Sequence, residues 1–317
     1  MRKGKFNDTP SVRIRRTPSE SVFNMLNITL MVLLCVIMIY PFWYVLVLAF
    51  NDARDSQMGG IWLWPRAFSL ENFRFVLKSP KVANAYLISI IRTVAGTMYS
   101  LLVTGIAAYF ASKRHVPFHG LILSFLMVPM FIGGTIVTNY IIIAKLGLLN
   151  NFLVYILPNG FSIFYMVIIR SFITDLPLGL EESAKLDGAG YFTIFFRIVV
   201  PLCAPVLASV ALFIALAHWL DFYSNLMYIT RVPRVGEFSL TTLQKLLYDV
   251  QNSLNAARDM AARARSGTLT VDNALTQMTP EAVKYATLIV TTLPILFVYP
   301  FFQKYFTKGL MLGAIKE

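Results

Sequence analysis

Six long apolar segments constrain this chain more than any other feature of its sequence. A helix that crosses a bilayer needs about 17 to 25 mostly apolar residues, and lipid admits only structures whose backbone hydrogen bonds are satisfied internally. The segments lie roughly at Met25–Phe50, Tyr86–Ala111, Leu121–Leu146, Phe152–Ile173, Val199–Ile229 and Ala286–Phe302. The sequence therefore predicts an all-α polytopic membrane protein with six transmembrane helices.

The composition excludes several other classes of protein. Of the 317 residues, 57% are hydrophobic and 14% are charged, whereas soluble domains average about 45–50% and about 25%. A disordered chain, a disulfide-stapled miniprotein and an ordinary soluble enzyme are thereby excluded. The two cysteines, Cys35 and Cys203, lie inside apolar runs and support neither a disulfide framework nor a zinc site.

The net charge of +12 points to a membrane surface more than to nucleic acid. The cations are scattered over tails and loops and do not form one compact basic domain. Basic residues gather on the cytoplasmic side of a membrane, where anionic lipids attract them. The basic N-terminal tail, the Lys113-Arg114 turn and the pair Lys304 and Lys308 therefore favour a topology with both termini in the cytoplasm.

The apolar segments divide the chain into a cytoplasmic tail (1–24), a six-span domain (25–302) and a second cytoplasmic tail (303–317). The first apolar run is longer than the core of a signal peptide, about 7–15 residues, so it is interpreted as an uncleaved span. The polar segment 231–284, with a helix predicted at Leu243–Arg265, is assigned to the external side. Two interpretations of it stay open: a cap over the pore, or a solvated insertion without a substrate role.

The cytoplasmic segment 174–205 differs from a simple connector. Pro177 in a first turn, acidic residues directly after it and Gly188 as a stop predict a helix of about three turns. Gly179 and Gly188 are expected to bracket this helix. Because a rigid helix between two flexible points transmits movement, the segment is a candidate for contact with a partner.

The composition of this helix favours a protein partner. An apolar stripe at helical spacing accompanies the pair Glu181 and Lys185, which stand four residues apart. The net charge of the segment is negative, which disfavours an anionic lipid surface and suits a basic protein. A second, aromatic helix follows Gly190, and Pro201 and Pro205 mark the entry into the fifth span.

No residue pattern predicts a chemical reaction or a bound cofactor. The chain lacks the Gly-x-x-x-x-Gly-Lys-[Ser/Thr] loop that cradles nucleotide phosphates. His115 and His119 enclose Pro117, which breaks helical spacing, and a third metal ligand is not apparent. We therefore expect no catalytic residue, cofactor or metal site, and the energy for any transport has to come from elsewhere.

Polar and aromatic residues inside the spans are candidates for a substrate path. An aromatic ring in such a path can stack on a substrate, but a tryptophan at the end of a span is more often a membrane anchor. His218 with Asp221 is also interpreted as a satisfied interfacial pair, and Arg92 either snorkels, pairs with another helix or lines the pore. The candidate path residues are Asn139, Asn159, Trp219 and Asp221.

The segment after the fourth span resembles a known family. Glu182-Ser183-Ala184, Asp187-Gly188-Ala189, Phe196, Ile198 and Pro201 keep the spacing of the EAA motif, which marks permease subunits of bacterial ABC importers with the MetI-like fold. Ser183 replaces the first alanine and Val200 replaces the usual leucine before the proline. Both are small changes.

Other stretches resemble the carbohydrate branch of these permeases, the MalG-like and especially the LplC/YtcP-like group. The resemblance covers nearly the whole chain. One difference is Glu317, where these permeases usually have glycine. The stretches are Tyr40–Trp43, Pro65–Phe73, His218–Asp221, Tyr299–Phe306 and Lys308–Lys316.

The resemblance implies a noncatalytic subunit in a bacterial cell membrane that forms half the pore of an oligosaccharide importer. Its implied partners are a second homologous permease, two cytoplasmic ATPase subunits that bind the ATP, and an extracytoplasmic sugar-binding protein. The EAA segment is implied to be a coupling helix whose docking residues are Glu181, Glu182, Ser183, Ala184, Asp187, Gly188 and Ala189. The C-terminal tail, at Gly309, Gly313 and Lys316, is implied to reach the ATPase as well.

An ion-coupled secondary transporter of sugars or other small solutes is the alternative. Such a protein needs an ion or proton site near the middle of the membrane and usually has an internal repeat. The sequence shows neither feature, and the EAA segment would be left without an explanation.

Overall fold

The computed structural model describes residues 18–113, 116–231, 238–253, 284–298 and 300. Within these residues every regular element is a helix, and the β contacts amount to one isolated bridge between Asn51 and Phe68. The elements are α1 Pro18–Ala49, α2 Ala53–Gln57, α3 Glu71–Lys78, α4 Pro80–Ser112, α5 His119–Phe131, α6 Ile136–Lys145, η1 Phe152–Tyr155, α7 Ile163–Thr174, α8 Leu178–Leu186, α9 Tyr191–Ile194, η2 Phe195–Val199, α10 Val200–Leu202, α11 Ala204–Leu220 and α12 Tyr223–Tyr228. Two more helices cover 243–253 and Lys284–Val298. The all-helical class is confirmed.

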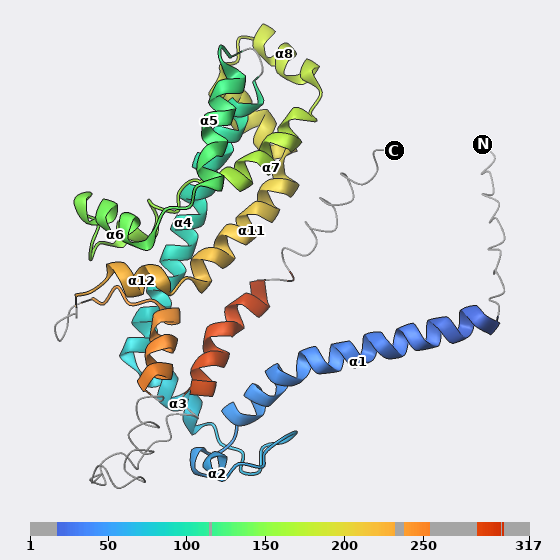
Figure 1. The fold of residues 1–317 in the computed structure, drawn as a ribbon, viewed down its shortest axis with the longest axis vertical. Coiled ribbons are helices and arrows are strands. Elements are labelled where there is room, and N and C mark those ends of the chain that lie inside the picture. The colour runs from blue at the N-terminus through green and yellow to red at the C-terminus, as the bar shows by residue number, and fades with distance from the viewer. Residues whose placement is uncertain (1–17, 114–115, 232–237, 254–283, 299, 301–317) are drawn as a thin grey trace, which may run out of the picture.

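Helix α1 stands apart from the other helices (Figure 1). It is a single rod of 32 residues, and only Val47, Leu48 and Ala49 in its last turn are buried. Most of its other side chains are apolar and exposed. Its length and hydropathy suit a bilayer crossing, so this exposed surface faces lipid or another membrane subunit.

Helices α4, α7 and α11 form the centre of the bundle, where α4 packs against both of the others. Their contact surface is a core that includes Ala108 of α4, Met166 and Ile169 of α7, and Val206 and Val210 of α11. Helix α4 runs from α3 at one end of the molecule to the neighbourhood of α8 at the other (Figure 1). It therefore connects the two faces of the bundle.

A second core ties the described part of segment 231–284 to the bundle. Leu243, at the start of helix 243–253, is fully buried with Val82 and Ala85 of α4 and with Val290. The backbone N–H of Leu243 donates to Ser89 Oγ at 2.8 Å. The helix predicted to begin at Leu243 does begin there, and its first turn belongs to the core of the protein; residues 254–265 of that prediction lie outside the described part.

Three of the predicted spans are interrupted helices in the structure. Leu121–Leu146 divides into α5 and α6, which meet at 115°, and the entry to the fifth span bends by 85° between Leu202 and Ala204. Glycines 133 and 134 follow Pro129 at the first break, and proline residues flank the second. Proline removes a helical hydrogen bond and glycine weakens a helix, so the helix breaks at these residues. The sequence remains apolar across each break, and for this reason hydropathy predicted one continuous span.

The predicted span Phe152–Ile173 is also shorter than expected. It begins as the single 3₁₀ turn η1, passes through Pro158 and Gly160, and becomes α-helical only in α7. By length and composition, α1 and α4 are each long and apolar enough to cross a membrane as single helices. If each of the three bent helix pairs also counts as one span, the described residues contain at most five spans. The prediction of six spans is therefore not established by these residues.

The close approach of α4 and α11 depends on Gly96. An ideal Cβ atom at this position would lie 2.6 Å from the Nε2 atom of the buried His218 ring. We expect Gly96→Ala to lower the free energy of unfolding by about 1–3 kcal/mol through overpacking, measured as a lower Tm of the detergent-solubilised protein. Gly120→Ala in α5, where a Cβ meets nothing within 4 Å, is the control; equal Tm values for the two variants would contradict the prediction.

Candidate functional site

Helix α8 lies at the end of the bundle farthest from α2 and α3 (Figure 1). It follows Pro177 directly and ends in a Schellman motif, in which Ala189 N donates to Ala184 O at 2.9 Å and Gly188 N donates to Lys185 O at 3.0 Å. Gly188 has φ +82°, a conformation that is strained for a residue with a Cβ. Gly188 therefore ends the helix, as the sequence predicts.

Gly179 does not bracket this helix. It lies in the first turn of α8, and its carbonyl accepts a hydrogen bond of 2.7 Å from Ser183 Oγ. The expectation of flexible glycines on both sides is wrong, because the turn before α8 is made by Pro177, whose fixed φ starts a helix without glycine. The start of α8 is consequently stiffer than predicted.

Glu181 fastens α8 to the C-terminal end of α4. Its carboxylate accepts a hydrogen bond of 2.6 Å from the Tyr109 hydroxyl and forms an ion pair with Lys113. The Lys113 ammonium also lies 4.2 Å from the centre of the Tyr109 ring. We call these three residues the Glu181 latch. The direct ion pair of Glu181 is with Lys113 and not with the expected Lys185. Lys185 lies 5.2 Å from the centre of the Tyr191 ring and attracts Glu181 only at longer range.

The Glu181 latch lowers the pKa of the Glu181 carboxyl. Burial raises the pKa of the Glu181 carboxyl, but hydrogen bonds from Lys113 and Tyr109 outweigh burial, so the pKa lies below its ordinary value. A carboxyl whose pKa is lower in the folded state than in the unfolded state stabilises the folded protein at any pH above the unfolded-state pKa, which is about 4.3 for glutamate. This stabilisation is lost as the pH falls through the pKa of the folded state.

We expect Glu181→Gln to remove this pH-dependent stabilisation. The native protein should have a higher Tm than the variant at pH 7, and the gap should narrow as the pH drops below about 4.3. Thermal unfolding of both proteins over a pH series tests this. A gap that stays constant across the series would show that the carboxylate charge is not what holds α8.

One face of α8 carries a stripe of exposed side chains, two of which, Leu178 and Glu182, also line a groove beside the bundle. Leu178 and Leu186 are 74% and 89% exposed, and Glu182 between them is exposed as well. The three stand four residues apart, so they share one face of the helix. Within the described residues Glu182 has no hydrogen bond or ion pair. Two large apolar side chains around a free carboxylate form a surface suited to another protein.

The opposite side of α8 rests on the bundle. Ala184 and Ala189 pack against the central core, together with Leu176 and Ile198. A groove of about 530 Å³ separates part of α8 from η2 and α10, with Leu180 and Lys185 on one wall and Ile198 and Leu202 on the other. The latch stands beside this groove, so α8 is held at defined points and not along its whole length.

The other motif residues lie next to α8. Phe195 of η2 is buried against Tyr109, and Phe196 stacks edge-on against Phe195 while remaining half-exposed. Pro201 is exposed in α10, directly before the bend into α11. Asp187 is exposed at the C-cap of α8. The structure thus gathers all predicted docking residues from 181 to 189 in one helix and the turn that ends it.

Residues 100–311, which include α8 and the bundle core, match the family described as the binding-protein-dependent transport system inner membrane component. The chain belongs to this family. Protein LplC of Bacillus subtilis (strain 168) is 33% identical over 96% of this chain and 98% of that protein. The polygalacturonan/rhamnogalacturonan transport system permease protein YtcP of the same organism is 28% identical over 93% of this chain and 98% of that protein.

The fold of a crystallised permease is shared as well. A bacterial ABC transporter involved in the import of the acidic polysaccharide alginate aligns with a TM-score of 0.79 at 20% identity, over 92% of this chain and 99% of that chain. The permease family membership and the permease fold predicted from the sequence are both confirmed. A membrane component of this kind is not the ATPase, whose activity lies in partner subunits.

The predicted path residues of the permease lie in three different surroundings. Asn139 is exposed on α6, beside Gly134, and Asn159 is exposed in the loop before α7. Trp219 is only 8% exposed and donates to Thr291 O at 3.2 Å. Asp221, after α11, forms an ion pair with Arg92. The predicted tail residues Gly309, Gly313 and Lys316 lie outside the described residues.

A buried polar network that the sequence did not reveal surrounds Asp221. Arg92 of α4 is 1% exposed, donates to Asp221 O at 2.7 Å and lies 4.5 Å from the centre of the Tyr155 ring. The Tyr155 hydroxyl donates to Leu240 O at 2.7 Å and also accepts a hydrogen bond from Asn225. Of the interpretations of Arg92, pairing with another helix is therefore the one that the structure bears out, and snorkelling is not. The predicted pair of His218 with Asp221 is wrong, because Asp221 pairs with Arg92 and the buried Nδ1 atom of His218 has no hydrogen-bond partner among the described residues. The position of Arg92 inside an apolar span was the signal. Tyr155 and Asn225 also lie inside predicted spans, but nothing in the sequence connects them to Arg92.

Proposed function

We propose that this permease is one of two membrane subunits in a binding-protein-dependent ABC importer that moves an oligosaccharide across the bacterial cell membrane. A second homologous permease completes the pore, two cytoplasmic ATPase subunits hydrolyse ATP, and an extracytoplasmic binding protein delivers the sugar. The name of the relative YtcP, which refers to polygalacturonan and rhamnogalacturonan transport, supports a substrate released from a polysaccharide.

The observation that carries this proposal is the exposed stripe of Leu178, Glu182 and Leu186 on a helix whose other side is fastened to the bundle. A basic cleft on an ATPase subunit fits the free carboxylate, and the leucines fill apolar positions beside it. Such an interface seats α8 as a rigid body.

Movement of α8 reaches the spans through named contacts. The Glu181 latch connects α8 to the end of α4. Arg170 of α7 donates from Nε to Ala111 O of α4 at 2.8 Å, so the helix preceding α8 is tied to the same end of α4. Closure of the ATPase subunits therefore displaces α4 and α7 together, which gives alternating access when the second permease moves in the same way.

The proposed topology retains six spans with both termini in the cytoplasm. Besides α1 and α4, the crossings are made by α5 with α6, by α7, by the bent pair that ends in α11 and by the apolar helix Lys284–Val298. Helix α8, which follows α7 after a sharp bend, lies outside the membrane in this topology. In this arrangement segment 231–284 is external, and the tails 1–24 and 303–317 are cytoplasmic, with Gly309, Gly313 and Lys316 directed to the ATPase. Asn139 and Asn159, which are exposed, line the sugar path together with Trp219 and Asp221 at its buried wall.

Affinity purification of the tagged subunit in mild detergent tests the proposal. Mass spectrometry is expected to find a second permease and an ATPase, and candidate binding proteins loaded with oligosaccharides should stimulate ATP hydrolysis by the complex. A stable subunit that repeatedly purifies without any ATPase, and that transports sugar in vesicles with an ion gradient, would replace the proposal with secondary transport.

A further inference from the structure

The chain between α1 and α3 presents an unusually apolar tip. Residues 58–68, which we call the tryptophan loop, connect α2 to the segment before α3. Met58, Trp62 and Trp64 in it are 81%, 68% and 71% exposed, and Leu63 and Phe68 are more than half exposed. Five large apolar side chains exposed on one short loop indicate a site of interaction.

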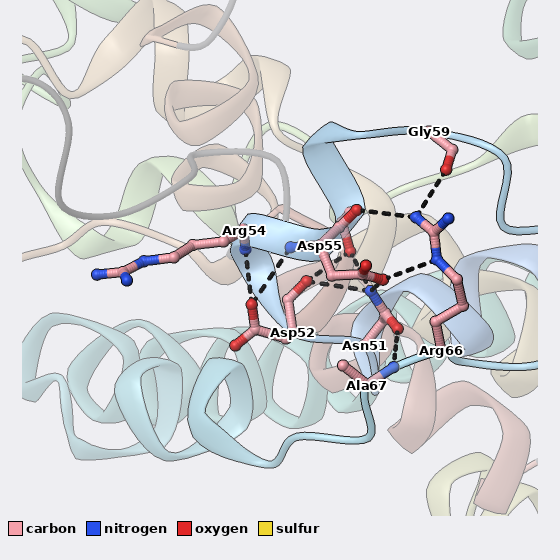
Figure 2. Close-up of polar contacts among 8 residues, drawn as sticks. Asn51, Asp52, Arg54, Asp55, Gly59, Arg66 and Ala67 are labelled. Atoms are coloured by element: carbon pink, nitrogen blue, oxygen red, sulfur yellow. Dashed lines mark hydrogen bonds and ion pairs between the residues drawn. The ribbon is translucent and has the colours of Figure 1, made fainter.

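The base of this loop is a rigid polar cluster centred on Asn51 (Figure 2). Asn51 is fully buried; its Nδ2 donates to Asp55 Oδ2 and to Ser56 Oγ at 2.9 Å each, and its Oδ1 accepts from Ala67 N at 3.0 Å. One side chain therefore joins both ends of the loop. The exposure of the aromatic residues is a feature of an ordered loop.

Arg66 closes the cluster from the other side. Its guanidinium donates to the Asp55 carboxylate at 3.2 Å and to Gly59 O at 2.9 Å (Figure 2). Gly59 and Gly60 adopt φ of +71° and +73°, which lets the chain turn away from the cluster. Arg66 is the one charged residue between Met58 and Leu70. Since its charge faces Asp55, the tip of the loop is neutral.

The tip folds back along α1. Trp43 Nε1 donates to Leu63 O at 2.8 Å, and the Trp64 ring meets the Trp43 ring edge-on at 5.5 Å. Trp43 precedes the end of α1 by six residues, which corresponds to about 9 Å along the helix axis. The tip therefore lies beside the rod of α1 and not beyond it, and Phe42, next to Trp43 in α1, is exposed as well.

We propose that the tryptophan loop is an interfacial membrane anchor that places Trp62, Leu63 and Trp64 among the phospholipid headgroups at the outer end of α1. Tryptophan is enriched at this depth because an apolar ring with one N–H group suits the boundary between acyl chains and water. A neutral aromatic tip beside a lipid-facing helix fits that boundary better than a soluble partner. The assignment to the outer leaflet rests on the proposed function, which places α8 in the cytoplasm.

Fluorescence quenching in vesicles tests the anchor. The chain has 4 tryptophans, so Trp43→Phe, Trp64→Phe and Trp219→Phe leave Trp62 as the sole emitter; a matched variant retains only the buried Trp219. Both are reconstituted in phosphatidylcholine brominated either near the headgroup or near the chain end, with iodide as the aqueous quencher. We expect shallow bromines to quench about half or more of the Trp62 emission, deep bromines to quench less, and iodide to have little effect.

Two results would overturn the anchor. Strong quenching of Trp62 by iodide without quenching by bromolipids would place the loop in water. Protection from both quenchers in the complex with its partner subunits would place it against protein. If the triple variant does not fold, the difference in emission between the native chain and Trp62→Phe gives the same comparison. The vesicle assay requires no ATPase. A negative result in it would therefore contradict the membrane anchor without bearing on the proposed transport function.

Discussion

Replacement of Glu182 by lysine is expected to reduce sugar uptake by about two orders of magnitude while the subunit remains in the membrane. Loss of one partner in a buried, hydrogen-bonded charge pair at an interface costs about 2–5 kcal/mol or more, and a reversed charge adds repulsion. Glu182 makes no contact that holds α8 to the bundle within the described residues, so the fold should be unaffected. Uptake of labelled oligosaccharide and recovery of the ATPase with the purified subunit measure the effect.

Glu71→Lys is the matched control for this experiment. Glu71 is an exposed acid in the first turn of α3, at the opposite end of the bundle from α8. The control should leave uptake and ATPase recovery near the native values. Normal uptake by an assembled Glu182→Lys variant would remove α8 from the proposed route of coupling.

Replacement of Arg92 by leucine is expected to be the most destabilising single change in the described structure. It leaves the Asp221 carboxylate without its cation inside the bundle and costs about 3–5 kcal/mol, the usual effect of breaking one side of a buried ion pair. The yield of monodisperse protein on size-exclusion chromatography and the Tm in detergent should both fall sharply.

A double variant separates the charge from the packing. Arg92→Leu combined with Asp221→Asn removes the unpaired charge and should recover part of the lost Tm. Arg74→Leu, at an exposed position of α3, is the control for removing an arginine. If Arg92→Leu is no less stable than Arg74→Leu, the buried pair does not hold α4 to the end of α11.

The sequence was most informative where local chemistry decides the structure. Pro177 and Gly188 determine the start and the end of α8 through their own backbone preferences, so the helix and its stop were predictable. The family was predictable from the spacing of residues in and after that helix. The docking role of these residues remains a prediction.

The breaks within the spans were not predictable from apolarity. Hydropathy continues through Gly133 and through Pro158, whereas the helix does not, because a window average does not register the loss of individual hydrogen bonds. Long-range pairs were missed for a different reason. Lys113 lies 68 residues before Glu181, and a sequence pattern evaluates only the nearby Lys185. Such pairs emerge only when α4 and α8 are placed in space.

The separation of α1 from the other helices has a consequence for how the cell makes this subunit. Only one turn of α1 contributes to the core, so the remaining helices do not need it in place to fold. Because α1 precedes the other helices of the bundle in the chain, it is synthesised before them. In the importer proposed above, its exposed surface lies in lipid until the second permease binds. For the proposed importer, we expect an unassembled copy to be recognised by membrane proteases through this helix, which would keep its two permeases in equal amounts.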